Sequence, residues 1–278
     1  MSEITVSDIL IYPIKGAQGV SVKSAEFTTE GLVGDRVFTI TRDGKRMAQG
    51  KIPALKYLRV TRCKQGLELN YPGEKAFLLA VDSSSPGEPL MSITRTIATL
   101  DMGDAVASWL SRCLQATVRL VKAQGPEPLP ISLAEFKLID GLKQSKFVDI
   151  APVLLTNEAS LLDLNTRLSE PVLMNRFRPN LVVSGLQAYQ EDQIRHLVFP
   201  SMRLEAMVAC ERCKVTTFSQ ETDVASKEPL RTLSRYRRRE NDYAGGVMFG
   251  TYLASSGNGA ISVGDQVILA DSAEYSLE

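Results

Sequence analysis

Short runs of strand-forming residues, separated by turn residues, recur through the first hundred positions of this chain. Ile4 to Ile14 and Arg36 to Thr41 are rich in β-branched residues, and Asp43-Gly44 after the second run is a typical hairpin signal. The pattern continues at short spacing in the runs 57–63, 67–71 and 76–81. Many short strands joined by turns predict a barrel or a sandwich.

Two segments depart from this pattern and show helical periodicity. In 104–114, apolar residues recur at three- and four-residue intervals. In 157–168, three leucines share one face, and Thr156 or Asn157 can cap the first turn. Strand-like runs then return at 181–183, 203–208, 215–218 and 261–269. We therefore predict a strand-dominated α+β protein with a few helices, rather than a doubly wound one. The stretch 124–130 has three prolines in five positions and is the best candidate for a domain boundary.

Charge and residue usage exclude several classes of function. The 32 basic residues balance 32 acidic residues, so the protein has no net charge that would attract it as a whole to nucleic acid or to a membrane surface. The single histidine, His196, excludes a multi-histidine metal site and is interpreted as a structural or surface residue. Four cysteines are too few for a disulfide scaffold and lack the clustering of an iron–sulfur site. With no leader and no long apolar run, we expect a reduced, cytoplasmic protein without a membrane span.

The stretch Cys210-Glu211-Arg212-Cys213 is the most suggestive of chemistry. Structural zinc would need two more ligands, and a thioredoxin-like pair would start a helix, whereas this pair lies between two strand-like runs. Two ordinary half-buried thiols remain the alternative interpretation. Against it, Cys213 lies between Arg212 and Lys214, and neighbouring cations favour the thiolate that binds soft metals.

Three basic residues lie next to turn motifs near predicted strand ends. Lys15 follows Tyr12-Pro13-Ile14, Arg36 follows Gly34-Asp35, and Arg178 precedes Pro179, which predicts an extended backbone at Arg178. Each residue alone is more often a solvated loop cation. Together with a thiolate they could instead bind an anionic cofactor, because arginine is well suited to phosphate. Their spacing in the sequence does not decide between solvated loop cations and cofactor-binding residues.

A run of five arginines lies between 231 and 240: Arg231, Arg235, Arg237, Arg238 and Arg239. Such a run is either a solvated face or a docking patch for an acidic partner protein. Its only interleaved aromatic residue is Tyr236, so nucleic acid is not expected as a partner.

The order of these motifs resembles that of the MOSC proteins (named for the C-terminal domain of molybdenum-cofactor sulfurase) with their N-terminal β-barrel domain. The resemblance is to the branch that contains the mitochondrial amidoxime-reducing component and its bacterial relatives. It implies a MOSC N-terminal β-barrel-like domain over 1–124 and a MOSC β-barrel domain over 125–278, which interleave and share one cofactor site. The motifs that carry it span almost the whole chain: Tyr12-Pro13-Ile14-Lys15, Gly34-Asp35-Arg36, Asn157-Glu158-Ala159-Ser160-Leu161, Phe177-Arg178-Pro179-Asn180, Arg212-Cys213, Lys227-Glu228-Pro229-Leu230, Phe249-Gly250-Thr251-Tyr252 and Val263-Gly264-Asp265.

The resemblance implies a molybdenum enzyme that does not require pyridoxal phosphate. Its metal would be held by a cysteine thiolate, which is Cys213 by motif position, and by the dithiolene of molybdopterin. Gly16 stands where relatives often have Ser, so that one side-chain contact is lost or replaced by backbone. The implied reaction is two-electron oxygen removal from small N-hydroxylated substrates (amidoximes, hydroxylamines, N-hydroxylated nucleobases), as in detoxification. The implied cofactor-binding residues are Lys15, Gly16, Arg36, Val148, Asp149, Arg178, Asn180, Arg212 and Tyr252.

The expected partner proteins depend on where this sequence differs from those of its relatives. From the sequence we expect neither the C-terminal ferredoxin-like domain of some bacterial relatives nor the N-terminal anchor of the mitochondrial ones. We therefore expect a separate electron-donor protein, ferredoxin- or cytochrome b5-like, that docks at the arginine run. Two alternatives remain: a sulfur carrier that uses a persulfide on Cys213, and a carrier that only binds molybdopterin.

Overall fold

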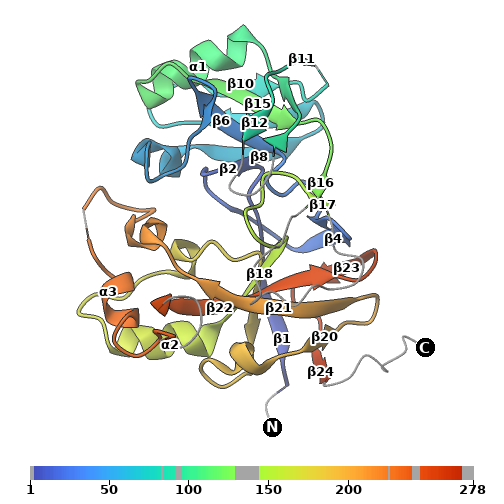
Figure 1. Ribbon diagram of the computed structural model, residues 1–278, viewed down its shortest axis with the longest axis vertical. Coiled ribbons are helices and arrows are strands. Elements are labelled where there is room, and N and C mark those ends of the chain that lie inside the picture. Colours follow the sequence, from blue (N-terminus) through green and yellow to red (C-terminus); the bar gives the residue numbers. More distant parts are fainter. Residues whose placement is uncertain are drawn as a thin grey trace.

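The computed structural model describes residues 3–82, 84–91, 96–128, 144–224, 226–239 and 245–270. Its elements form two lobes stacked along the long axis of the molecule, and strands predominate in both (Figure 1). The α-helices of the described residues are α1 (Asp104–Leu114), α2 (Glu158–Thr166) and α3 (Leu230–Leu233). None of these helices is both long and apolar enough to cross a membrane.

The upper lobe in Figure 1 holds two sheets and α1. One sheet has the order β11-β14-β15-β6-β2, with β7 paired to β6, and the other has the order β10-β9-β8. The predicted strand runs at 36–41, 57–63, 67–71 and 76–81 are confirmed there at slightly different bounds, whereas most of the run 4–14 lies in the lower lobe. The bounds are β2 (Ile14–Lys15), β6 (Phe38–Arg42), β7 (Lys45–Arg46), β8 (Arg59–Cys63), β9 (Gly66–Asn70), β10 (Phe77–Leu79), β11 (Ser85–Pro86), β14 (Thr99–Asp101) and β15 (Arg119–Ala123), beside the pair β12 (Leu90–Met91) and β13 (Thr96–Ile97).

Local sequence explains both the hairpin and the helix of this lobe. Asp43 and Gly44 join β6 to β7 with φ angles of 51° and 67°, as a two-residue turn between twisted strands requires. The helix α1 has the bounds that its periodicity predicts, and it buries Trp109 and Leu110 with the other apolar residues of that face. The Trp109 indole N–H donates to the Lys75 carbonyl at 2.8 Å, so its polar atom is satisfied inside the core.

The lower lobe is built on an eight-stranded sheet of order β24-β20-β21-β22-β18-β19-β1-β3. The three-stranded sheet β23-β4-β5 also belongs to this lobe, and the pair β16-β17 lies between the two lobes (Figure 1). The bounds are β1 (Thr5–Ile11), β3 (Val20–Val22), β4 (Ser24–Thr28), β5 (Gly31–Leu32), β16 (Glu127–Pro128), β17 (Gln144–Ser145), β18 (Val153–Asn157), β19 (Leu181–Ser184), β20 (His196–Val198), β21 (Arg203–Glu211), β22 (Met248–Ser255), β23 (Gly259–Ser262) and β24 (Ile268–Ala270).

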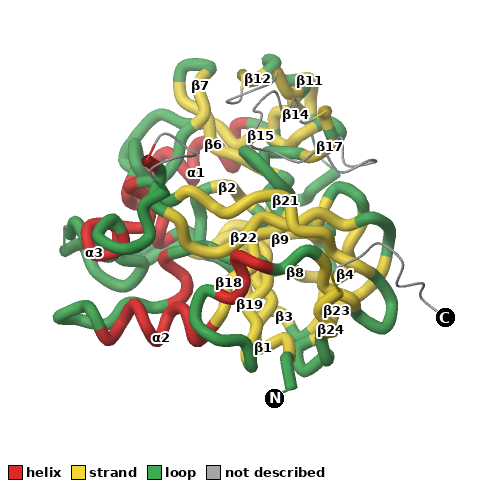
Figure 2. Tube along the Cα trace, turned by 60° about the horizontal axis from the view of Figure 1, so that its bottom comes forward, coloured by secondary structure: helices red, strands yellow, loops and turns green. Residues whose placement is uncertain are grey.

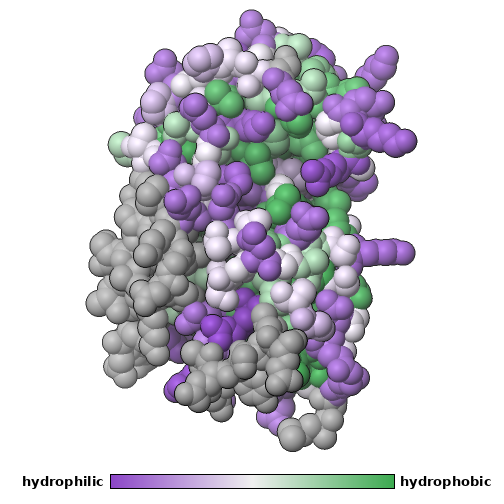
Figure 3. Space-filling view, turned by 90° about the vertical axis from the view of Figure 1, so that its right-hand side faces the viewer, coloured by the Kyte–Doolittle hydropathy of each residue, from purple (hydrophilic) through white to green (hydrophobic). Residues whose placement is uncertain are grey.

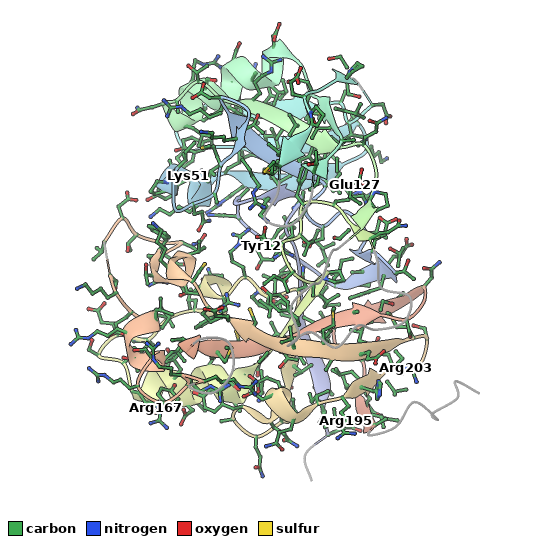
Figure 4. The ribbon with its side chains drawn as sticks, in the orientation of Figure 1. Tyr12, Lys51, Glu127, Arg167, Arg195 and Arg203 are labelled. Atoms are coloured by element: carbon green, nitrogen blue, oxygen red, sulfur yellow. The ribbon has the colours of Figure 1, made fainter. Side chains whose placement is uncertain are left out.

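The first strands of the chain belong to the lower lobe, although the chain then leaves to build the upper one. In β1, Val6 lies opposite Val183 of β19, and in β4, Ala25 lies opposite Ile261 of β23. The chain thus crosses between the lobes near Tyr12, which lies where they meet (Figure 4). The division at residues 124 and 125 stays a prediction, and the last two residues of the proline-rich stretch lie outside the described part.

The helices α2 and α3 lie on the same side of the lower lobe (Figure 2). The Asn157 side chain accepts the Ala159 N–H at 3.1 Å, so the predicted N-cap of α2 is confirmed. Beneath the helices, Leu164 and Leu233 pack in one cluster with the stacked rings of Phe177 and Phe249. This cluster supports the segment that carries Arg178.

The prediction of a strand over 215–218 was wrong. The structure has a 3₁₀ helix at Lys214–Thr217, directly after Cys213. The Thr216 hydroxyl donates to the Cys213 carbonyl at 3.0 Å, and the Thr217 hydroxyl to the Lys214 carbonyl at 2.7 Å. Threonine hydroxyls that bond to nearby backbone stabilise such a turn, and β-branching alone does not reveal that alternative.

On the face shown in Figure 3, hydrophobic residues occur in small groups among hydrophilic ones. The exposed large apolar side chains of the described residues are correspondingly dispersed over different elements, for example Leu78 in β10, Leu162 in α2 and Ile268 in β24. Single exposed apolar side chains of this kind are ordinary.

Candidate functional site

A cavity of 190 Å³ brings together residues from distant parts of the sequence. Lys15 and Gly16 come from the end of β2, while Cys213 follows β21. The residues that the resemblance implies for binding of the cofactor and metal all line this cavity: Lys15, Gly16, Arg36, Val148, Asp149, Arg178, Asn180, Arg212, Cys213 and Tyr252. The structure thus places the predicted site residues together, while the role of each stays a prediction.

One wall of the cavity is an ion-paired network around Asp149. Its carboxylate oxygens lie 2.5 Å from the Lys15 ammonium and 2.6 Å from the Arg46 guanidinium. The Lys15 ammonium also donates to the Phe147 carbonyl at 2.7 Å. Burial lowers the pKa of Lys15 to about 7, although Asp149 opposes this shift. Burial by itself raises the pKa of Asp149, but the two cations outweigh burial and hold that pKa well below its ordinary value.

Arg36 is held by three acceptors. Its guanidinium donates to the Asp35 carboxylate, to the Asn180 side-chain oxygen at 2.9 Å and to the Arg178 carbonyl at 3.4 Å. Asn180 is almost fully buried, and its amide also donates to the Leu10 carbonyl at 3.1 Å. Asn180 therefore orients Arg36 as well as lining the cavity.

The prediction of an extended backbone at Arg178 was wrong, because its φ is 55°. Its N–H donates to the Asn175 carbonyl at 3.2 Å, which closes a turn, and its guanidinium donates to the Ala17 carbonyl at 2.7 Å. Arg36 has a φ of 46°, so two cavity arginines adopt a conformation that non-glycine residues rarely take. Such strain persists only where surrounding contacts determine the position, and it is common at functional sites.

Tyr12 lies beneath these two arginines. The guanidinium carbons of Arg36 and Arg178 lie 4.7 and 4.3 Å from the centroid of its ring. Burial raises the pKa of Tyr12 to about 12, so that its hydroxyl stays neutral. The aromatic face thus stabilises both cations by cation–π contact without adding a negative charge.

Cys210 is buried and supports the cavity from behind. Its sulfur accepts a hydrogen bond from Arg212 Nη1 at 2.8 Å, while Arg212 Nη2 donates to the Phe177 carbonyl at 2.7 Å. Burial, and next the neighbouring Cys210 sulfur, raise the pKa of Tyr252 well above its ordinary value. One buried thiol therefore contacts two cavity-lining side chains, from β22 and from the end of β21.

Cys213 is exposed and lines the cavity, whereas Cys210 does neither. Among the four free cysteines, Cys213 is thus the one whose sulfur can reach a ligand in this cavity. Cys113 is buried in α1, and Cys63 lies on β8. His196 is buried in β20 and is not part of the cavity lining.

Sequence reasoning missed three polar or charged residues of the site, besides several apolar residues of its lining. Arg46 pairs with Asp149, and Glu211 lines the cavity. The buried Gln49 donates to the Gly16 carbonyl at 2.8 Å and to the Gln220 side chain at 3.1 Å, which joins the lobes. Arg46 and Gln49 lie far in sequence from the groups that they contact, and no local motif marks them.

The arginine run is not one uniform surface. Arg231, Arg235 and Arg238 are exposed. Arg237 instead pairs with Asp192, lies 4.3 Å from the Tyr189 ring centroid and has only 15% of its side chain exposed. The expectation that Arg237 belongs to a docking patch is corrected accordingly, because its charge is already used inside the fold.

Comparison with known proteins agrees with this arrangement. Residues 3–117 match the MOSC N-terminal beta barrel domain, and residues 143–268 match the MOSC domain. Mitochondrial amidoxime reducing component 2 of Bos taurus is 34% identical over 276 residues, which cover 95% of this chain and 82% of that protein. Mitochondrial amidoxime-reducing component 1 of Homo sapiens is 34% identical over 281 residues, with the same two coverages.

Among solved structures, the YuaD protein from Bacillus subtilis aligns over 96% of this chain and 97% of its own. Its TM-score is 0.40 at 10% identity, and it adds nothing to the assignment. The two matched domains and the full-length relatives do assign the family. The chain belongs to the MOSC family with an N-terminal MOSC β-barrel domain, in the branch of the mitochondrial amidoxime-reducing components.

Proposed function

We propose that this protein is a molybdenum-cofactor-dependent oxidoreductase that removes oxygen from N-hydroxylated compounds. The observation that carries the proposal is one exposed thiol, Cys213, in the same cavity as four cationic side chains. Relatives that match 95% of this chain are named amidoxime-reducing components, which supports the reaction class. The cations are Lys15, Arg36, Arg178 and Arg212.

The charges of the cavity fit an anionic pterin cofactor. Arg178 and Arg212 are deeply buried guanidinium groups, and neither has a carboxylate partner within the described part of the chain. A buried cation without a counter-ion is costly, so an anionic ligand at these side chains would be stabilising. Arg212 Nε is also buried without a hydrogen-bond partner, which leaves one donor for such a ligand.

In this proposal the residues of the chain bind and orient the cofactor. Lys15, Arg36, Arg178 and Arg212 hold its phosphate and pterin, and Cys213 supplies the soft sulfur ligand that molybdenum takes. When bound, the metal provides two-electron redox chemistry with an oxygen atom. Asp149 keeps Lys15 in place, and Tyr252 remains a neutral hydrogen-bonding group because its pKa is raised.

Metal and pterin analysis of the purified protein tests this proposal. We expect molybdenum and pterin fluorescence in stoichiometric amounts, and loss of molybdenum in Cys213→Ser. The matched control is Cys63→Ser, which removes a thiol on β8 outside the cavity lining. The wild type should also convert benzamidoxime to benzamidine with a chemical reductant as electron donor.

Other outcomes favour the two alternatives. Cyanide-labile sulfur on Cys213 without pterin would contradict the proposal and indicate a sulfur carrier. Stoichiometric cofactor without reduction of any N-hydroxylated compound would indicate a cofactor-binding carrier. A Cys213→Ser variant that keeps its full molybdenum content would exclude the proposed ligand.

A further inference from the structure

Glu211 gives the cavity a carboxylate that pairs with no cation among the described residues. The other lining carboxylate, Asp149, is engaged by Lys15 and Arg46. Among the described residues, the Glu211 carboxylate has neither an ion pair nor a hydrogen bond, although Arg212 is its neighbour in sequence. The Arg212 guanidinium turns instead to the Cys210 sulfur and the Phe177 carbonyl.

Backbone packing places this carboxylate. Glu211 is the last residue of β21, lies opposite Met248 of β22 and is two residues from Cys213. A Cβ atom added to Gly246 would lie 2.8 Å from Cγ of Glu211, so the side chain rests against the Gly246 backbone. A residue larger than glycine at position 246 would displace the Glu211 side chain. The exposed carboxylate is thus held beside the cavity by sterics, without a counter-ion.

The proposed reaction creates a positive charge for which such a carboxylate is suited. An amidoxime, R–C(=NOH)NH₂, takes two electrons and three protons and yields the amidinium R–C(NH₂)₂⁺ and water. The N–O bond breaks, its oxygen leaves as water, and the electrons come from the donor protein or a chemical reductant. A neutral substrate thereby becomes a cation, whereas a hydroxamic acid yields a neutral amide.

Resting on the proposed function, we infer that Glu211 determines substrate specificity by favouring N-hydroxylated amidines and guanidines, whose products are cations. N-hydroxylated compounds with neutral products gain nothing from this carboxylate. A group that interacts more strongly with the developing cation than with the neutral substrate raises kcat/KM for the first class only. Because Glu211 is exposed, its contribution is about two- to fivefold, as for a surface ion pair, and it decreases as salt rises.

Binding of benzamidine tests the inference without turnover. Calorimetry on the protein as purified should show two- to fivefold weaker binding by Glu211→Gln than by the wild type, and partial retention by Glu211→Asp. The matched control is Glu205→Gln, which removes a carboxylate on the same strand six residues before Glu211 and outside the cavity lining. Equal affinity of wild type and Glu211→Gln would overturn the inference.

Turnover provides the second readout. With a chemical reductant, Glu211→Gln should lower kcat/KM for benzamidoxime and leave kcat/KM for benzhydroxamic acid unchanged, and added salt should remove the difference between the two proteins. An equal decrease for both substrates would assign Glu211 a general structural role and overturn the specificity role. If the loaded wild type reduces neither substrate, the proposed function fails, while benzamidine binding still decides whether Glu211 recognises the cation.

Discussion

At the scale of single residues, the site depends on which charges the fold has already neutralised. Asp149 forms ion pairs with both Lys15 and Arg46, whereas Arg178 and Arg212 stay without carboxylate partners in the described part of the chain. Both are buried, so that their charges are weakly screened. The cavity is therefore prepared for an anion before any ligand arrives.

Lys15 makes anion binding dependent on pH. Because burial lowers its pKa to about 7, the protonated fraction of Lys15 falls as pH rises through that value. Affinity for an anion held by Lys15 should fall in the same direction, by up to about tenfold between pH 6 and pH 8. Sulfate is a suitable probe, because its own charge does not change in this range, and binding can be measured by calorimetry.

Lys15→Arg is the control, because arginine stays charged at every pH of interest. Its sulfate affinity should be independent of pH between 6 and 8. A wild-type affinity that is equally flat would contradict the prediction.

Cys210 should matter for cofactor retention although its sulfur does not line the cavity. In Cys210→Ala, Arg212 loses the acceptor at 2.8 Å and becomes a poorly satisfied buried cation, at a cost of about 1–3 kcal/mol. We expect lower stability in urea and less pterin per protein. Cys113→Ala removes another buried thiol, from α1, and should lower stability but keep the pterin content. Equal pterin content in both variants would show that Cys210 is only a packing residue.

At the scale of elements, β21 and β22 form the base of the site. The pairing of β21 with β22 shifts register between Ala206 and Val208 and again between Ala209 and Glu211. A β-bulge redirects side chains and often occurs beside a functional site. Here the second shift falls at Cys210, which lies behind the cavity, and directly before Glu211, which lines it.

Gly250 in β22 permits the close approach of β18. Its φ is 80°, and an added Cβ would lie 2.5 Å from the Leu155 carbonyl oxygen. Gly250→Ala should therefore lower the free energy of unfolding by about 2–4 kcal/mol, as measured by urea denaturation. In the control Gly257→Ala, the added Cβ meets open space, and the change should stay within about 0.5 kcal/mol. Similar losses in both variants would refute this account of Gly250.

At the scale of the whole molecule, the cavity exists because the chain leaves the lower lobe and returns to it. Lys15 and Arg36 lie on segments that connect to the upper lobe, while Cys213 and Tyr252 come from the large sheet. Gln49 and Gln220 join the two parts by hydrogen bonds. Binding residues that meet at such a junction are brought together only when both lobes are folded.

Substitutions in the arginine run should separate an effect on stability from an effect on turnover with a protein electron donor. Arg237→Glu breaks the pair with Asp192 and should lower the melting temperature, whereas Arg238→Glu changes an exposed charge and should not. If an acidic donor protein docks at Arg231, Arg235 and Arg238, Arg238→Glu should slow turnover with that donor and leave dye-driven turnover unchanged. Equal effects on both kinds of turnover would exclude docking at this surface.

The sequence by itself was sufficient for the elements that depend on local contacts. The periodicity of α1, the Asn157 cap and the Asp43-Gly44 turn each depend on residues that are close in sequence, and all three predictions are confirmed. The family was also predictable, and so were ten of the residues that line the cavity, because the order of the motifs is retained in the chain. Local rules failed at Arg178 and at 215–218, where hydrogen bonds outweighed the preference of the residue type.

Only the tertiary structure decided how the charges and thiols of those motifs are used. It separated Cys210 from Cys213 by burial, turned Arg237 inward to Asp192 and, within the part of the chain that the structure describes, gave Glu211 no cation as partner. These outcomes depend on contacts between residues that are near in space, some of them far apart in sequence, such as Asp149 with Arg46. Residue type and spacing carry no record of solvent exposure or of charge partners, because both arise when the lobes pack.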